Sequence, residues 1–329
     1  MPHARRLMLT PLLLAIVLLG GCRNTQSVLS PNSDITDQLT LLTMVLVVGA
    51  TIIFIGVLAL VAISIAGSDR ARERLAHPKA IVVGGVIFPI VTLTALLAYG
   101  LTLIPMKAEA ESPLQIAVEG EQWWWRVTYP LSDGTKVETA NELRLPAGRP
   151  VRISLTTADV IHSFWIPELA GKLDMIPGRT NVLQFTPNAP GSYRGQCAEY
   201  CGGAHAHMGL RAVVLEPEAF DMWFAKERSP AQEPEGQETQ RGRELFTTRG
   251  CPACHAITGT PAVGRIGPNL THIGSRRAIA AERLPMSKEN LKRWIQHNDR
   301  LKPDNLMPSY AELPDEEIDA IATYLAGLK

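Results

Sequence analysis

The chain has 329 residues with 32 Lys and Arg against 32 Asp and Glu, so its formal net charge is zero. That balance argues against a nucleic-acid-binding protein, which normally carries a basic excess. Hydrophobic residues make up 46% of the chain, which argues against intrinsic disorder. The length suggests two or three modules, and the apolar residues gather before residue 106, so a membrane part is predicted to precede a soluble part.

Residues 1–22 are typical of a bacterial lipoprotein signal peptide. Arg5 and Arg6 form the basic start, Leu7 to Leu19 form the apolar stretch, and Leu19-Gly20-Gly21-Cys22 matches the lipobox. We therefore predict processing at Cys22 and lipidation of its thiol. The alternative is an uncleaved apolar anchor with an incidental cysteine.

Two apolar runs without charged residues follow, over 39–66 and 80–105. Each exceeds the ~20 residues that a helix needs to cross a bilayer. The loop between them is basic from Arg70 to Lys79, and the positive-inside rule places it in the cytoplasm. Residues 23–106 are therefore predicted to form an N-terminal segment and a two-helix hairpin in the bacterial cytoplasmic (inner) membrane. The later residues would then lie on the periplasmic face.

Short stretches rich in Val, Ile and Leu alternate apolar and polar residues from about Pro113 to Pro217, with Pro and Gly between them. No long helical period appears until Pro217 to Arg228. Residues 107–228 are therefore predicted to form an all-β sandwich or barrel with one trailing helix. The strand candidates are LQIAV at 114–118, ELRLP at 142–146, PVRISLTT at 150–157, NVLQFTP at 181–187 and GLRAVVLEP at 209–217.

The loop GQCAEYCGGAHAHMG at 195–209 concentrates metal-binding residue types. Two thiolates, two imidazoles and a thioether form a soft ligand set that favours copper over magnesium, calcium or manganese. A mononuclear blue-copper site needs one cysteine, so the second thiolate favours two copper ions bridged by both sulfurs. The predicted ligands are His162, Cys197, Cys201, His205 and Met208, with the backbone carbonyl of Glu199.

Two other sites could use the same cysteines. Cys197 and Cys201 could form a structural disulfide, because the predicted compartment is oxidising. A tetrahedral zinc site could use the same Cys and His ligands. Neither alternative has a use for Met208. The neighbouring His207 is predicted to be a surface residue.

The copper-loop residues resemble the Cys-x-Glu-x-Cys-x-x-x-His-x-x-Met motif, with an upstream His, of subunit II of the haem–copper cytochrome c oxidases. The resemblance spans about residues 30–228 and includes the hairpin, GEQWWW and GKLDMIPGRTN. It implies a cupredoxin fold with a mixed-valence dinuclear copper centre that passes electrons to a haem in subunit I. It also implies that the Glu199 side chain contributes to a magnesium site shared with subunit I, and that electrons enter at Trp123.

The second apolar run departs from that family in one respect. Many members carry a Glu near the cytoplasmic start of this span, which feeds a proton path in subunit I. Here Val82 and Val83 occupy the region, and Glu73 in the loop is the nearest acidic residue. The sequence therefore gives no support for proton uptake through this subunit.

Residues 229–238 are polar and acidic and are predicted to be a linker. The following module, 239–329, contains Cys251-x-x-Cys254-His255, the attachment motif for haem c. Both thiols would form thioethers with the haem, and His255 would ligate the iron. A thioredoxin-like pair or a zinc half-site is the alternative, but no second CxxC and no βαβ pattern accompanies the motif.

This last module resembles a class I cytochrome c, with GRELF, GPNL and NLMPSY in the expected order. The resemblance implies an all-α fold, Met307 as the second axial ligand, and Pro268 packed near His255. Met286 is the rival thioether, and His272 or His297 would give a bis-His haem instead. A Met ligand raises the haem potential, as a donor to copper requires, which favours Met307.

Together these features predict the subunit through which electrons enter a membrane haem–copper terminal oxidase. A soluble or membrane cytochrome c would supply electrons to the chain's own haem. The dinuclear copper would then pass them to subunit I, where oxygen is reduced to water with coupled proton translocation. The chain would thus be a subunit of an enzyme, assembled with subunit I and other oxidase subunits, with no catalytic residue of its own.

Two alternative functions stay open at this point. The corresponding subunit of a copper-containing nitric oxide reductase would have a similar sequence. A membrane-anchored copper-delivery protein is the other alternative, and the haem motif argues against it. Nitrous oxide reductase shares a similar copper loop, but it lacks the hairpin and has a further cluster domain that is absent here.

Overall fold

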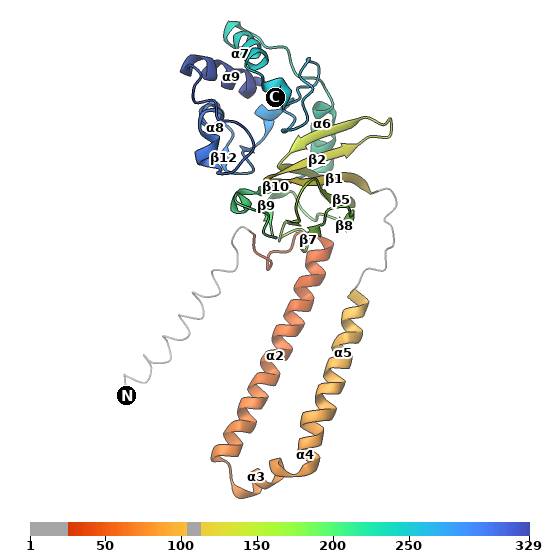
Figure 1. Cartoon of the computed structure of the whole chain (residues 1–329). Helices are drawn as coiled ribbons and strands as arrows, with labels where there is room; N and C mark the ends of the chain where they lie inside the picture. Colours follow the sequence, from red (N-terminus) through yellow and green to blue (C-terminus); the bar gives the residue numbers. More distant parts are fainter. Residues whose placement is uncertain (1–25, 104–112) are drawn as a thin grey trace, which may run out of the picture. The chain divides into compact units, whose positions relative to one another are not determined.

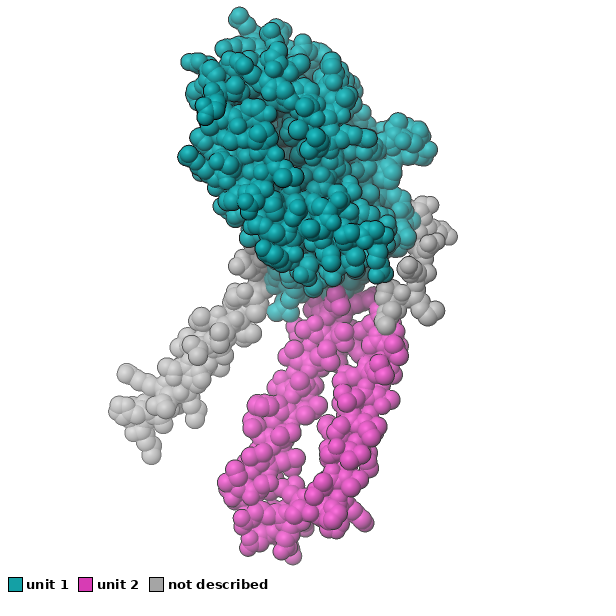
Figure 2. All heavy atoms as spheres, viewed as in Figure 1, with its two compact units in different colours: residues 1–36, 112–329 teal, residues 37–111 magenta. Residues whose placement is uncertain are grey.

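The computed structural model describes residues 26–103 and 113–329. The chain divides into two compact units, one of residues 37–111 and one of the remainder (Figures 1 and 2). The predicted signal peptide, Cys22 and the end of the predicted hairpin at 104–106 lie outside the described residues.

The smaller unit contains the two predicted apolar helices. Their side chains are apolar on every side, and large residues such as Phe54 and Ile65 are exposed. A surface of this kind suits lipid, and the two helical segments of 33 and 26 residues are long enough to cross a bilayer. The connecting loop contains a short helix that the sequence did not predict. The elements are α2 (Asp34–Ala66), α3 (Asp69–Ala76), α4 (Pro78–Val82), the π-helical turn η2 (Val83–Ile87) and α5 (Phe88–Leu103).

The start of α2 is held by a reciprocal cap. The Ser33 N–H donates to Thr36 Oγ1 at 3.0 Å, and the Thr36 N–H donates to Ser33 Oγ at 3.1 Å. This pairing satisfies amide groups that the first helical turn leaves without partners. The Ser33 hydroxyl also donates to the Leu169 carbonyl at 2.6 Å, which ties this segment to the β domain.

The β domain consists of two five-stranded sheets packed face to face, with strand orders β3-β2-β1-β5-β8 and β4-β10-β9-β6-β7. Side chains alternate between the core and the outside along the strands, as in β1, where Ile116 and Val118 are buried. The strands are β1 (Leu114–Glu121), β2 (Trp124–Pro130), β3 (Lys136–Ala140), β4 (Glu142–Pro146), β5 (Val151–Thr157), β6 (His162–Trp165), β7 (Leu173–Met175), β8 (Asn181–Phe185), β9 (Gly191–Cys197) and β10 (Gly209–Leu215).

The five predicted stretches form β1, β4, β5, β8 and β10, and the all-β fold is confirmed. The predicted trailing helix is α6 (Pro217–Glu227). Its rings pack edge-on against the buried Tyr129, with a centroid distance of 5.5 Å between Tyr129 and Trp223. The rings of Trp223 and Phe224 thus extend the core of the β domain.

The C-terminal domain is helical, as predicted. Its first and last helices, α7 and α9, approach each other closely at Gly242. A side chain at this position would overlap the Ala320 carbonyl of α9, so the contact requires glycine. Helix α8 packs on α9 and is kinked at His297 (φ −134°, ψ 33°). The elements are α7 (Gln237–Thr248), the 3-10 turns η4 (Cys251–Ala253) and η5 (Ile273–Ser275), strands β11 (Ala278–Ile279) and β12 (Leu284–Pro285), α8 (Lys288–Leu301) and α9 (Asp315–Gly327).

Candidate copper and haem sites

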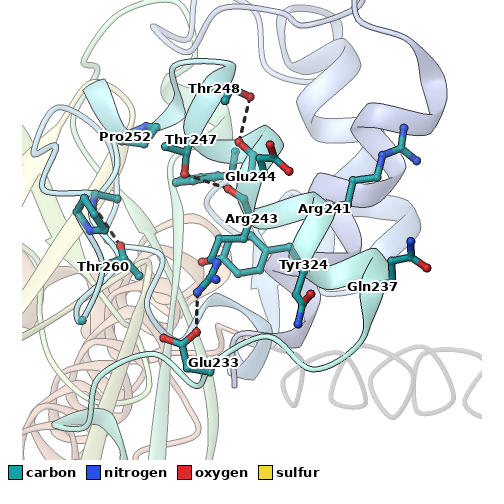
Figure 3. Close-up of a pocket in the computed structure, with 15 residues that line it drawn as sticks. Glu233, Gln237, Arg241, Arg243, Glu244, Thr247, Thr248, Pro252, Thr260 and Tyr324 are labelled. Atoms are coloured by element: carbon teal, nitrogen blue, oxygen red, sulfur yellow. Dashed lines mark hydrogen bonds and ion pairs between the residues drawn. The ribbon is translucent and has the colours of Figure 1, made fainter.

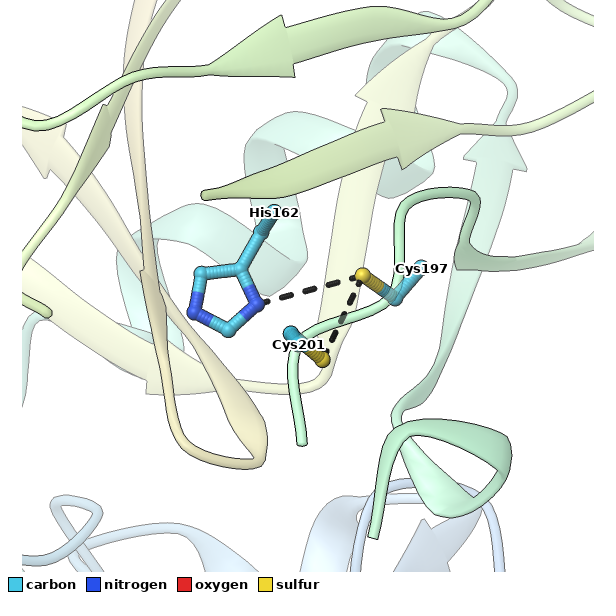
Figure 4. Close-up of side chains that lie close together, drawn as sticks. All are labelled: His162, Cys197 and Cys201. Carbon is cyan, nitrogen blue, oxygen red and sulfur yellow. Dashed lines mark hydrogen bonds between the residues drawn. The ribbon is translucent and has the colours of Figure 1, made fainter. Parts of the chain in front are cut away.

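Strand pairing brings the two halves of the candidate copper site together. His162 begins β6 and Cys197 ends β9, and these strands pair with Phe164 opposite Cys197. His162 is fully buried, and its Nδ1 lies 3.8 Å from the Cys197 sulfur (Figure 4). A residue 35 positions upstream thus becomes a neighbour of the copper loop.

The copper loop folds back so that its other predicted ligands converge on Cys201. Its sulfur lies 3.8 Å from the Cys197 sulfur, 3.4 Å from His205 Nδ1 and 3.8 Å from the Met208 sulfur. A disulfide needs a sulfur–sulfur distance of about 2.05 Å, so the two cysteines are separate thiols. The Cys197 sulfur also lies 3.2 Å from the Glu199 carbonyl oxygen. All six predicted ligands therefore surround one small volume.

The donor set fits a soft metal. The hydrogen bond between the two sulfur atoms lowers the pKa of Cys197 and raises the pKa of Cys201, so the pair supplies a thiolate readily. Met208 is fully buried beside the cysteines. A tetrahedral zinc site has no use for that thioether, whereas copper does. The Glu199 residue is exposed and its carboxylate accepts the Tyr200 N–H at 3.3 Å, whereas its backbone carbonyl lies beside the Cys197 sulfur.

Asp159 contacts a predicted copper ligand and was not singled out from the sequence. One of its carboxylate oxygens lies 2.8 Å from His162 Nε2, and the other accepts the Gln122 N–H at 2.7 Å. An acceptor on Nε2 fixes the ring so that Nδ1 faces the sulfur atoms. Burial alone would lower the pKa of His162, but its hydrogen bonds with Cys197 and Asp159 raise that pKa. The sequence offered one sign of this contact, because Asp159 lies three positions before His162.

The three adjacent tryptophans lie in different environments. Trp125 is fully buried in the barrel, and Trp124 is partly exposed with the Arg126 guanidinium 4.7 Å from its ring centre. Trp123 is 8% exposed, and its indole N–H donates to the Cys201 carbonyl at 2.9 Å. Trp123 therefore contacts the copper loop at Cys201. Trp125 contacts the same loop at Met208, whose carbonyl accepts its indole N–H at 3.4 Å.

The haem motif forms the turn η4 directly after α7. His255 is held from behind, because its Nδ1–H donates to the Pro268 carbonyl at 2.8 Å and leaves Nε2 free to bind iron. Burial lowers the pKa of His255, which favours the neutral ligand. Cys251 and Cys254 are separate thiols on the same turn, available for two thioether bonds. These residues fit a covalently attached haem.

Two asparagines form hydrogen bonds with the loop that contains Met307, the predicted second ligand. The Met307 N–H donates to Asn305 Oδ1 at 3.0 Å, and the buried Asn298 side chain donates to the Pro308 carbonyl at 3.0 Å. Asn305 opens the NLMPSY motif, but the sequence assigned no role to either asparagine. The rival Met286 also packs against the domain core. His272 lies with its Nε2 3.0 Å from the Ser229 carbonyl, and its Nδ1 is buried without a hydrogen-bond partner, so its geometry alone does not distinguish it from a ligand.

A groove of about 1020 Å³ lies beside α7 and α9 in the same domain (Figure 3). Its wall includes Arg243, Tyr324 and Thr260, and Arg243 pairs with Glu233 there. The predicted haem ligands do not line it. Pro252, between the two haem-attachment cysteines, does line it, so the groove borders the attachment turn.

The two soluble domains contact each other through polar groups. Arg211 on β10 pairs with Glu282 at 2.7 Å from Nε, and the Arg277 N–H donates to the buried Glu142 at 2.9 Å. Arg126 donates to the Arg265 carbonyl at 2.8 Å. The haem domain is thus bonded to the copper domain at several points beyond the linker.

Comparison with known proteins gives two matches on this chain. Residues 131–215 match the family described as cytochrome c oxidase subunit II, periplasmic domain, and residues 239–329 match the cytochrome c family. Cytochrome c oxidase subunit 2 of Alkalihalophilus pseudofirmus is 33% identical over 80% of this chain and 77% of its own length. The Bacillus subtilis protein of the same name is 32% identical over 97% of each chain. The crystal structure of the periplasmic domain of cytochrome oxidase subunit II from Bradyrhizobium japonicum is 32% identical over 36% of this chain and 96% of that chain, with a TM-score of 0.34.

Proposed function

Because the chain belongs to the cytochrome c oxidase subunit II family, we propose a route for its electrons: from a haem c in its C-terminal domain, through a copper pair in its barrel, to the haem of subunit I. The chain is the subunit through which electrons enter a haem–copper oxidase, and it works as part of that complex. It is anchored in the membrane with its soluble domains outside. Oxygen reduction belongs to the partner subunit.

The observation that carries the copper assignment is the pair of separate sulfur atoms 3.8 Å apart, each with a histidine nitrogen within 3.8 Å. Cys197 and Cys201 would bridge the two ions, and His162 and His205 would each complete one ion. Met208 and the Glu199 carbonyl would supply the weaker contacts. When bound, the pair accepts and releases one electron.

The haem assignment uses the second set of residues. Cys251 and Cys254 would hold the haem covalently, His255 would ligate the iron through Nε2, and Met307 would be the second ligand. The bonds of Asn298 and Asn305 around Met307 support this choice, because they fix the loop that presents the sulfur. Electrons would come from a soluble or membrane cytochrome c.

The remaining assignments extend the same function. The exposed Glu199 carboxylate is available to a magnesium ion shared with subunit I. Processing and lipidation at Cys22, a two-span hairpin in the bacterial inner membrane, oxygen as the acceptor and coupled proton translocation complete the proposal. We divide the chain into 1–22, 23–106, 107–228, a linker at 229–238, and 239–329.

The test is metal and redox analysis of the purified complex. This subunit should contain two copper ions and one covalent haem, and electron paramagnetic resonance should show one unpaired electron shared over both copper nuclei. Cys197→Ser or Cys201→Ser should abolish that sharing while the covalent haem stays. A single-copper signal from the unmutated complex would refute the copper assignment. Consumption of nitric oxide in place of oxygen would refute the acceptor.

A further inference from the structure

Lys302 is the only lysine or arginine that is buried in the described parts of the chain, with 4% of its surface exposed. It caps the C-terminal end of α8, five residues before Met307. Its side-chain nitrogen donates to the backbone carbonyl of Trp123 on the copper domain. Among the described residues, no carboxylate lies within 4.0 Å of this nitrogen. A buried lysine without an acid partner is costly, so its position requires an explanation.

The surroundings of Lys302 join the two cofactor sites. On the haem side, Asn305 donates to the Lys302 carbonyl at 2.8 Å and accepts the Met307 N–H at 3.0 Å. On the copper side, Trp123 donates from its indole nitrogen to the Cys201 carbonyl at 2.9 Å. Four hydrogen bonds, linked through Asn305, Lys302 and Trp123, therefore connect the Met307 loop to the loop that contains Cys201.

The two loops also touch directly next to this chain of bonds. Gly203 lies two residues after Cys201, and a side chain there would overlap the carboxylate of Asp304. Asp304 in turn lies two residues after Lys302. The Gly203 backbone and the Asp304 side chain are therefore in close contact, and the ion pair of Arg211 and Glu282 joins the domains elsewhere on the interface.

We propose that Lys302 is the positioning residue that locks the Met307 loop onto Trp123, and so holds haem and copper in one arrangement for direct electron transfer. This inference rests on the proposed route from haem c to copper. The step moves one electron, so the haem is oxidised by one electron and the copper pair is reduced by one. No bond is made or broken, and no further reactant is needed.

The test uses the complete oxidase with Lys302→Met, which keeps the length and apolar stem of the side chain but removes the donor. Losing the hydrogen bond that Lys302 donates to Trp123 weakens the association of the two domains by about fivefold. We expect the rate of haem-to-copper transfer after flash reduction of the haem to fall by about that factor. Hydrogen–deuterium exchange should rise in 203–211 and 300–306, which reports the docking without any redox step. The absorption spectra of both cofactors should stay unchanged.

Lys292→Met on the same helix is the matched control, because Lys292 pairs with Asp315 inside the haem domain. It should change neither the rate nor the exchange. Lys302→Gln is the second variant if the Met variant fails to assemble, and it should show the same losses because its amide is too short to reach Trp123. Unchanged transfer and exchange in an assembled Lys302 variant would overturn the inference. Absence of haem-to-copper transfer in the unmutated oxidase would instead refute the route itself.

Discussion

His162 Nε2 and Asp159 Oδ1 lie 2.8 Å apart, and this bond turns the other ring nitrogen of His162 toward the Cys197 sulfur. Asp159 also holds the Gln122 N–H through its second oxygen. One carboxylate therefore orients both a candidate copper ligand and the residue before Trp123.

Asp159→Ala should weaken copper binding, because an outer-shell partner of a metal-binding histidine is worth about 10–100-fold in affinity. The measurement is a copper competition titration on the purified complex. Asp174→Ala is a control on the neighbouring strand β7, and it should leave copper affinity unchanged. Equal copper affinity in the Asp159 variant and the unmutated protein would contradict this role.

Met307→Ala should lower the haem potential and remove the weak sulfur–iron absorption of the oxidised form, because a thioether ligand raises the potential. The covalent attachment through Cys251 and Cys254 should persist. Met286→Ala is the matched comparison, since both methionines pack against the same domain core. The reverse result, with the absorption lost only in the Met286 variant, would reassign the ligand.

Trp123→Phe should slow electron transfer from haem c to copper and leave the copper spectrum intact. The ring would stay, but the indole N–H that bonds the Cys201 carbonyl at 2.9 Å would be lost. Trp124→Phe removes an N–H from a partly exposed ring and serves as the control. Flash-induced kinetics measure both variants. Loss of copper from the Trp123 variant would show that the residue is structural.

Gly242→Ala should destabilise the haem domain, because the new methyl group would overlap the Ala320 carbonyl where α7 crosses α9. Overpacking of this kind costs about 1–3 kcal/mol. Gly327→Ala is the control, since nothing lies within 4 Å of a methyl group at that helical position. Thermal unfolding followed at the haem absorption should show a lower midpoint only for the Gly242 variant.

Docking of the haem domain should strengthen as pH rises above about 7. Burial lowers the pKa of Lys302 from 10.5 to about 7, and a smaller electrostatic effect of Cys201 opposes this shift. When the haem domain is undocked, Lys302 has its ordinary pKa of 10.5. Between pH 7 and 10.5 the undocked form therefore binds more protons than the docked form. Raising the pH in this range removes those protons and favours docking. The other titratable group that faces it is His207, whose own pKa is lowered mainly by burial.

The pH effect is measurable as hydrogen–deuterium exchange of 300–306, corrected for the intrinsic pH dependence of exchange. Protection should grow from pH 7 to 9 in the unmutated oxidase and stay flat in Lys302→Met. Protection that falls with rising pH would contradict the assigned sign.

The sequence predicted the elements whose residues carry a local pattern. Strands such as β5 alternate apolar and polar residues, and the ligands of both sites sit in short motifs. Strand β9 escaped prediction because its residues, GSYRGQC, include little apolar surface. Asp159, Asn305 and Lys302 escaped for a different reason. Their roles depend on partners that folding supplies, and Lys302 meets Trp123 across 179 positions of chain.

The linker between the soluble domains is itself bonded to the haem domain. The Ala231 N–H donates to the Thr258 carbonyl at 2.9 Å, and the Ser229 carbonyl lies 3.0 Å from His272 Nε2. Cutting the chain there would therefore leave the two halves together as a non-covalent complex. A chimaera that grafts a foreign cytochrome onto this barrel would need to copy the docking face around Glu282 and Lys302, because tether length alone would not reproduce the fit.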